Sequence, residues 1–234
     1  MKKKIGIHWF RYDLRINDNP SLNYLSKNYD NVLGIYIFDD VNSNPKLGSA
    51  SRVWLNYSLE YLKKQLNENL IVLKGNPKEC LDQLMDFFDV QEISWNRCYE
   101  PWIIKRDKGL KVYLNEKIKV KSFNGSLLWE PWEILKKDGT PYKVFTPFYK
   151  KGCLSAVNPR IPKSRKINFF NHNFRTTSVS DLNLLENKKW ESETLSQWRV
   201  GETNSVEIMK SFFQNGIQDY SEGRNYLKEI ILLM

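Results

Sequence analysis

Four charged residues follow the first apolar segment of the chain and are its first candidates for chemistry. Arg11, Asp13, Arg15 and Asp18 lie within eight positions, directly after the apolar run that starts at Ile5. Ligands of open parallel sheets bind at the carboxyl ends of strands, where an arginine can clamp an acidic tail or a phosphate through charge-assisted hydrogen bonds. The alternatives are a network of structural ion pairs and a solvated loop whose pairs contribute little.

Other residues at the ends of expected strands, or in the helices after them, complete a set that could form the wall of a ligand site. The set is Phe10, Arg11, Asp13, Phe38, Asp39, Arg52 and Arg106. No Gly-x-Gly-x-x-Gly follows the first strand and no Gly-x-x-x-x-Gly-Lys occurs, so an ordinary dinucleotide or P-loop site is not expected. Charged side chains, and not a glycine-rich loop, would hold the ligand.

Short apolar runs alternate with amphipathic stretches over the first half of the chain. Residues spaced by three or four predict one helix over 50–66, another after Pro77, and a third from near Pro101 to about Asn115. This alternation predicts an α/β fold with a doubly wound, five-stranded parallel sheet. The expected strands are Ile5–Phe10, Val32–Phe38, Leu70–Leu73, Glu92–Trp95 and Ile118–Phe123.

The second half of the chain is organised differently. From about Gly139 to Trp198 the periodicity fades and four prolines interrupt the sequence, as expected for an extended linker over the sheet domain. A short helical segment follows, with an apolar stripe from Val206 to Phe213, Gly216 as its C-cap, and Asn204 with Glu207 as a capping box. The expected divisions are 1–130, 131–198 and 199–234.

Composition narrows the class of protein. The chain has 234 residues, three widely spaced cysteines and two histidines, which argues against a disulfide framework, a zinc cluster or any other metal site. It contains no run of about 18 apolar residues, so no membrane span is expected. We expect a cytoplasmic monomer.

The formal net charge of +9 is concentrated in the linker. Between Gly139 and Ser180 there is no Asp or Glu, while eight Lys and Arg side chains alternate with aromatic residues such as Tyr149. Such a segment could follow a phosphate backbone, or it could simply be a lysine-rich solvated linker.

Several segments, in order and at similar spacing, resemble the DNA photolyase/cryptochrome family. They are Trp9–Pro20, Gly48–Leu55, Trp95–Pro101 with Arg106-Asp107, Phe123–Leu128, Gly139–Phe148, Trp198–Glu202 and Tyr220–Asn225. The resemblance covers residues 5 to about 225. Val144–Phe148 within it is expected to pack the linker against the sheet domain.

The resemblance implies a carbon–carbon lyase that repairs pyrimidine dimers in DNA with an electron from light-excited, reduced FAD. By the family motif, Tyr220 would contact FAD and Arg224 would contact DNA. The α/β domain would carry an antenna chromophore, which could be a deazaflavin, a flavin or a folate. Trp102-Ile103 stands where folate-binding members commonly have Asn-Glu, which disfavours folate.

The chain departs from the family after Asn225. Leu227 replaces an expected proline, and the Thr-Ser-x-x-Ser-Pro segment that grips the FAD phosphates does not follow. The sequence is therefore expected to be a truncated photolyase that neither binds FAD nor repairs DNA alone, with no catalytic residue of its own. The alternatives are part of a cryptochrome-type photosensor or a free-standing α/β module that binds a chromophore or nucleotide.

Overall fold

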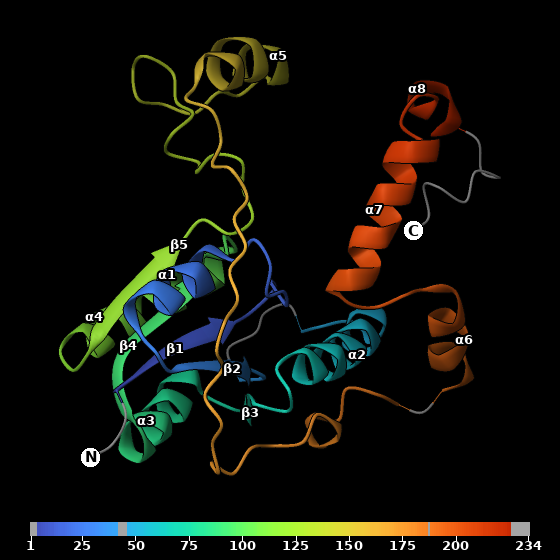
Figure 1. Cartoon of the computed structure of the whole chain (residues 1–234). Coiled ribbons are helices and arrows are strands. Elements are labelled where there is room, and N and C mark those ends of the chain that lie inside the picture. Colours follow the sequence, from blue (N-terminus) through green and yellow to red (C-terminus); the bar gives the residue numbers. More distant parts are fainter. Residues whose placement is uncertain (1–3, 42–45, 187, 226–234) are drawn as a thin grey trace. The chain divides into compact units, whose positions relative to one another are not determined.

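The computed structural model describes residues 4–41, 46–186 and 188–225, apart from the side chains of residues 194–197. Its five strands form one sheet in the order β3-β2-β1-β4-β5 (Figure 1). The pairs β1–β4, β4–β5 and β2–β3 are parallel. The predicted α/β fold is therefore confirmed. The strands are β1 (Lys4–Phe10), β2 (Val32–Phe38), β3 (Leu70–Lys74), β4 (Asp89–Asn96) and β5 (Lys119–Phe123).

The strand order explains why the ends of β1 and β4 matter. The chain places β2 and then β3 on one side of β1, and β4 and then β5 on the other. The direction of winding therefore reverses next to β1, and the carboxyl ends of β1 and β4 flank the switch point at which such sheets bind ligands.

Three of the four helices between the strands match the predicted ones closely. They are α2 (Ser49–Gln65), α3 (Pro77–Phe87) and α4 (Pro101–Asn115). The fourth, α1 (Pro20–Asn28), was not predicted because it is short and only Leu22 and Leu25 supply buried apolar side chains. Its amino end is well defined, since Asn19 Oδ1 accepts a hydrogen bond from Leu22 N at 3.1 Å.

Two compact units make up the chain. The first contains residues 1–13, 17–32 and 88–168, and the second contains 14–16, 33–87 and 169–234. In the first unit α1 packs on β1, β4 and β5, and α4 packs on β5.

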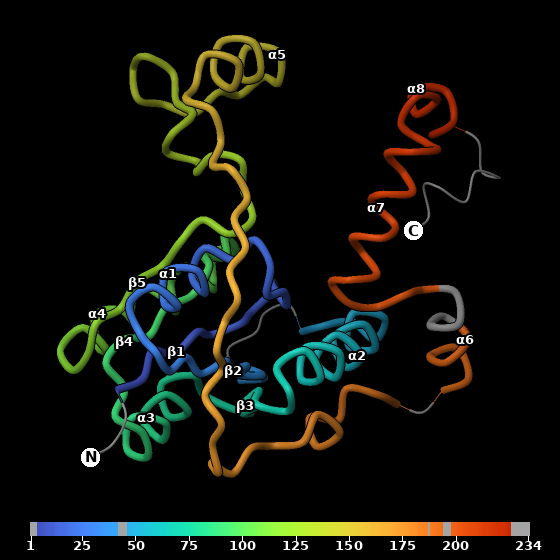
Figure 2. The backbone as a smooth tube through the Cα atoms, in the orientation of Figure 1, coloured from blue at the N-terminus to red at the C-terminus, as the bar shows by residue number. Residues whose placement is uncertain are grey.

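The linker contacts α1 and the turn before it in the first unit and β3 in the second, and Figure 2 follows its extended course. In the first unit Arg160 forms two hydrogen bonds with the carboxylate of Asp18, and Asn23 Nδ2 donates to Lys163 O at 2.5 Å. In the second unit Thr177 N donates to Val72 O at 2.8 Å, so the linker adds a backbone hydrogen bond to β3.

Short helical turns interrupt the linker. They are α5 (Phe145–Pro147), a π-helical turn at Phe148–Gly152, 3₁₀ turns at Cys153–Ser155 and Ser180–Leu182, and α6 (Lys189–Gln197). The expectation that Val144–Phe148 packs against the sheet domain was wrong. Val144 and Phe145 are 63% and 73% exposed, and Phe148 contacts Tyr142 within the linker itself.

The helical segment after the linker is α7 (Glu202–Asn215), followed by α8 (Tyr220–Gly223). Gly216 caps α7 as predicted, since its N–H donates to Phe212 O. The predicted capping box was wrong, because α7 begins at Glu202 with Gly201 as its N-cap. Gly201 has φ 109° and its Cα lies against the ring of Tyr61, so a side chain at this position would be both strained and crowded.

Thr177→Pro is expected to lower the free energy of unfolding by about 1 kcal/mol, because it removes the N–H that donates to buried Val72. Thr177→Ala is the matched control, since it shortens the side chain and keeps the N–H. Urea denaturation of both variants checks the prediction. Equal midpoints for the two variants would show that this backbone bond contributes nothing.

Candidate ligand site at the strand ends

The ends of β1 and β4 present different side chains to the two faces of the sheet. Trp9 pairs with Trp95 and His8 with Ser94 in the parallel register. Because successive side chains of a strand alternate between faces, the two indoles lie on one face while His8 and Ser94 lie on the other. All four side chains are almost completely buried, so both faces are packed at the strand ends.

Arg11, the first residue after β1, is the centre of the site. Its Nη1 donates to Asp107 Oδ2 at 2.6 Å, and its Nη2 donates to the carbonyl oxygen of Asn96 at 2.8 Å. Only 6% of the residue is exposed. These bonds join the end of β1 to the end of β4 and to α4.

Arg106 shares both the carboxylate and the aromatic surface that Arg11 uses. Its Nε and Nη2 lie 3.2 and 3.0 Å from Asp107 Oδ1. The guanidinium groups of Arg106 and Arg11 lie 5.0 and 5.2 Å from the ring centroid of Trp9. Arg106 also lies 5.5 Å from the Trp102 ring. Two cations are therefore held by one carboxylate and by cation–π contacts.

Asp13 is held by donors from three directions. It accepts from Arg11 N at 3.1 Å, from Asn19 Nδ2 at 3.4 Å and from Asn96 Nδ2. Burial raises the pKa of the Asp13 carboxyl above its ordinary value, although the hydrogen bonds from Asn96 and from Arg11 N act in the opposite direction. His8 Nε2 lies 3.9 Å away.

A buried row of polar groups continues from Asp13 beneath α1. Asn19 Nδ2 lies 3.3 Å from His8 Nε2, His8 Nδ1 lies 2.8 Å from Ser21 Oγ, and Ser21 Oγ lies 2.6 Å from Ser94 Oγ. Each of the four side chains in this row has a hydrogen-bond partner within it, so the row fixes α1 on the sheet.

Together these contacts describe a closed network with a partly accessible edge. Both terminal nitrogens of Arg11 are engaged, whereas the buried donors Arg11 Nε, Trp9 Nε1 and Trp95 Nε1 have no hydrogen-bond partner. The accessible edge consists of Tyr12, which is 65% exposed, with half-buried Trp102 and Arg106. Burial, followed by the charge of Glu100, raises the pKa of Tyr12.

The structure thus brings four of the sequence candidates into one unit. Arg11, Asp13 and Arg106 surround Asp107 and Asn96, as the structural-network alternative anticipated. Phe10 is completely buried against His8 and has no exposed surface for a ligand.

The other three candidates lie in the second unit. Arg52 forms an ion pair with Glu186 of the linker. Phe38 and Asp39 are half-buried at the end of β2, where Phe38 O accepts from Gly75 N at 3.0 Å.

Tyr220 and Arg224 lie side by side in the described structure. The Arg224 guanidinium is 5.8 Å from the Tyr220 ring centroid, as expected for side chains on one helical face. Tyr220 also meets Phe212 edge to face at 5.7 Å. No described side chain of α7 or α8 is buried, so these helices provide no enclosing wall around Tyr220.

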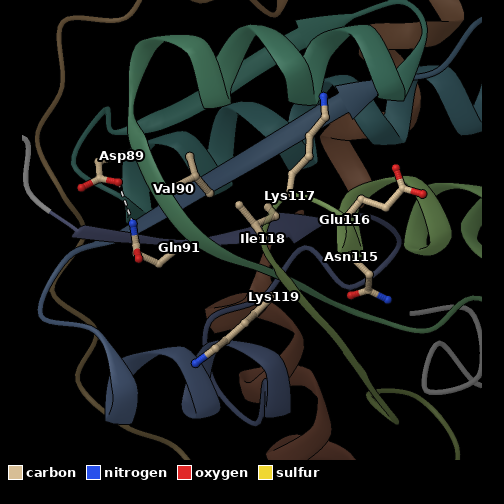
Figure 3. Close-up of a pocket in the computed structure, with 8 residues that line it drawn as sticks. All are labelled: Asp89, Val90, Gln91, Asn115, Glu116, Lys117, Ile118 and Lys119. Carbon is tan, nitrogen blue, oxygen red and sulfur yellow. Dashed lines mark hydrogen bonds between the residues drawn. The ribbon is translucent and has the colours of Figure 1, made fainter.

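An open hollow of about 730 Å³ occurs at the other end of the sheet (Figure 3). It lies where β4 and β5 begin, and its lining mixes carboxylate, amide, ammonium and aliphatic side chains. The lining residues are Asp89, Val90, Gln91, Asn115, Glu116, Lys117, Ile118 and Lys119. Ligands of this sheet class bind at the carboxyl ends, so we place the candidate site there and not in the hollow.

Sequence reasoning missed three residues that hold the network: Asn19, Asn96 and Asp107. Asn96 ends β4 and could have been found by the same strand-end argument that selected Phe10 and Phe38. Asp107 stood next to the candidate Arg106, but its bond to Arg11 crosses 96 positions of the sequence.

The sequence also predicts no metal site, no membrane span and no disulfide framework, and the described residues can be examined for each. Within them, no cluster of three or more His, Cys, Asp and Glu side chains could hold a metal ion. No helix in residues 4–41, 46–186 or 188–225 is long and apolar enough to cross a membrane. Cys80, Cys98 and Cys153 are free thiols.

Comparisons with known proteins give this architecture a family. The family model described as DNA photolyase matches residues 6–165. A deoxyribodipyrimidine photo-lyase of Agrobacterium fabrum is 31% identical over 238 residues, which cover 94% of this chain and 47% of the relative. The chain belongs to the DNA photolyase family.

Solved structures agree with this assignment. A bacterial class III photolyase from Agrobacterium tumefaciens is 30% identical, with a TM-score of 0.88 over 97% of this chain and 48% of that protein. An archaeal photolyase from Sulfolobus tokodaii, solved with two FAD molecules, is similar in fold, with a TM-score of 0.65 at 19% identity over 98% of this chain and 60% of that one. The chain spans about half the length of the curated photolyase it matches.

Asp107→Asn is expected to destabilise the protein by about 3–5 kcal/mol, because it leaves the buried guanidinium of Arg11 without its counter-charge. Glu116→Gln, at an exposed position just after α4, is the control for loss of one negative charge. Chemical denaturation measures both. A loss no larger than that of the control would show that the Arg11–Asp107 pair is not structural.

Asp13→Asn is expected to change the pH dependence of stability. Because the folded-state pKa is raised, the contribution of Asp13 is fully present below its ordinary value of about 4 and is lost as pH rises through the raised pKa. The Asp13→Asn variant should not show this loss of stability as pH rises. Asp138→Asn is a control whose pH effect has the opposite direction. Hydrogen bonds from Thr140 lower the pKa of Asp138, so its contribution to stability is lost as pH falls. Unfolding free energies measured from pH 3 upward test the sign, and identical curves for the parent and Asp13→Asn would contradict it.

Proposed function

We propose that this chain is the α/β half of a light-driven DNA-repair lyase that acts on pyrimidine dimers. The observation that carries the proposal is the match of 97% of the chain to a class III photolyase at a TM-score of 0.88 and 30% identity. Repair is preferred to a cryptochrome-type signalling role because the relative at 31% identity is named a deoxyribodipyrimidine photo-lyase.

Photolyases related to this chain bind FAD, which supplies the electron for repair when it is bound. In this chain Tyr220 would contact the flavin and Arg224 would contact DNA, as the family motif suggests. Tyr220 is 43% exposed and the described side chains around it form no buried pocket. We therefore propose that flavin binding and repair need the portion of the protein that longer relatives possess beyond this match.

The proposed contribution of the α/β half is to hold a light-harvesting chromophore at the strand ends. The engaged terminal nitrogens of Arg11 support a positioning role, in which Arg11 keeps Asp107 and Arg106 in place. A planar, anionic chromophore would meet Arg106 and the half-buried ring of Trp102 at the accessible edge. We favour a deazaflavin or a flavin over folate because Trp102-Ile103 departs from the usual folate-binding pair.

The test is the absorption and fluorescence spectrum of the 234-residue chain, purified in the dark and titrated separately with FAD, folate and deazaflavin. We expect about one equivalent of an antenna chromophore and no repair of dimer-containing DNA under illumination, whichever chromophore is bound. Arg106→Gln should weaken chromophore binding about tenfold or more, as loss of a charge-assisted contact would.

Lys105→Gln removes an exposed positive charge from the same helix and should leave chromophore binding unchanged. A chain that takes up no chromophore would refute the antenna role. Stoichiometric FAD with flavin-dependent repair would instead show that the flavin site is formed by this chain alone.

A further inference from the structure

Two cationic side chains of the first unit meet at the hydroxyl group of Ser122 on β5. Lys111 Nζ donates to Ser122 Oγ at 2.7 Å, and Arg97 Nη1 donates to the same oxygen at 3.1 Å. Ser122 pairs with Trp95 in the register of β4 and β5, and Lys111 Nζ lies 5.7 Å from the ring centroid of Trp95. We call Lys111, Arg97 and Ser122 the Ser122 cluster.

The carboxylate that binds Arg97 is enclosed, whereas the cation is not. Glu130 Oε1 accepts from Arg97 Nε at 2.8 Å and also from Nη2, and Glu130 Oε2 accepts from Tyr99 OH at 2.8 Å. The Glu130 side chain is 4% exposed and the Arg97 side chain is 28% exposed. The negative charge is therefore taken up inside the fold, and the solvent side of the cluster is positive.

Lys111 has no carboxylate of its own. Among the described residues, no carboxylate lies within ion-pair distance of its Nζ, and its hydrogen bond goes to the neutral Ser122 hydroxyl. Asp107, four positions earlier on α4, is bonded instead to Arg11 and Arg106. A half-buried ammonium group without a counter-charge is costly, so the cluster favours a negative charge supplied from outside.

The cluster also has hydrogen-bond donors that the described structure does not use. The ammonium group of Lys111 has three N–H donors and Ser122 takes one of them. Ser122 Oγ accepts from both cations, and no described acceptor takes its own hydrogen. Unused donors beside an uncompensated positive charge fit a ligand that has several acceptor oxygens and a negative charge.

We propose that the Ser122 cluster binds a small, freely diffusing oxyanion of the sulfate or phosphate class. Lys111 and Arg97 supply the positive charge, and Ser122 supplies a hydroxyl donor. Lys111 and Arg106 are five positions apart on α4, and therefore about 140° apart around the helix, so this site differs from the accessible edge at Arg106. Binding requires neither a chromophore nor DNA.

The experiment is equilibrium dialysis of the 234-residue chain against radiolabelled sulfate, with the ionic strength held constant by sodium chloride. We expect the parent to bind about one equivalent. Lys111→Met keeps the apolar stem and removes the charge, and it should weaken binding about tenfold or more. Lys108→Met removes an exposed charge from the same helix and should bind like the parent.

Thermal melts separate binding from folding. In chloride, Lys111→Met should melt no lower than the parent, because it replaces a half-buried ammonium group that lacks a carboxylate partner with an apolar group. Sulfate should raise the melting temperature of the parent and of Lys108→Met at equal ionic strength, since a ligand stabilises the state that binds it. It should not raise that of Lys111→Met to the same extent.

The pH dependence of sulfate binding tests the role of Lys111. Burial, followed by the charge of Arg97, lowers the pKa of the Lys111 ammonium group; Arg11 acts in the same direction and Asp107 opposes them. A bound anion favours the charged form, so sulfate affinity should fall as pH rises through this pKa. Lys111→Arg stays charged over the same range, so the affinity that it retains should not fall in this way.

Competition identifies the form of the ligand. Displacement of sulfate by inorganic phosphate supports the proposal, and displacement by glycerol 3-phosphate as well would extend the ligand to phosphate monoesters. If the parent binds no sulfate saturably, or if Lys111→Met binds it equally well, the proposal is overturned. Sulfate affinity of the parent that stays constant with pH would remove Lys111 from the site. None of these results bears on the repair assignment.

Discussion

The buried pair of Arg11 with Asp107 is the interaction on which the strand ends depend. A guanidinium that is taken out of water must recover its hydration energy from partners, and Arg11 does so through a carboxylate on α4 and a carbonyl on β4. The end of β1 is thereby joined to β4 and α4, whose bonded residues lie 85 and 96 positions further along the sequence. Asp13, Arg106 and the two indoles take their positions from this pair.

The site therefore has two parts with different roles, a buried network of charges and an edge that is accessible to a ligand. The interior charges satisfy one another, which keeps the switch point of the sheet rigid. Tyr12, Trp102 and Arg106 at the edge remain available to a ligand. A chromophore bound there, as we propose, would keep a fixed orientation, and orientation affects the efficiency of excitation-energy transfer.

The linker also has two parts, one bound to folded elements and one exposed to solvent. Its contacts with Asp18 and with Val72 tie it to the turn before α1 in one unit and to β3 in the other. The turn between Val144 and Leu154 keeps large apolar side chains in solvent. Longer relatives have about as much chain again.

Sequence reasoning succeeded where the signal is local. Alternating apolar runs gave all five strands, and Pro77 and Pro101 marked the first turns of two helices. It failed at α1, which has too few apolar residues to show a period. It also failed at Phe145, where an aromatic residue suggested packing although no described partner buries the ring.

The candidate site shows the same limit more clearly. Three of the residues that the strand-end rule selected, Arg11, Asp13 and Arg106, lie close together in the structure. The identity of their partners could not be predicted, because Asn96 and Asp107 reach Arg11 only once β4 and α4 have packed beside β1. A linear sequence shows which charges exist, but the tertiary fold decides which of them neutralise each other.

The sharing of Asp107 by two arginines has an evolutionary consequence. Loss of the carboxylate alone would leave two cations over the Trp9 indole, and loss of Arg11 alone would remove the bond from α4 to the end of β1. Each single step is costly, whereas joint replacement of the charged groups by apolar ones can be nearly neutral. Positions 11, 106 and 107 are therefore expected to change together among descendants of this chain, as one inherited unit.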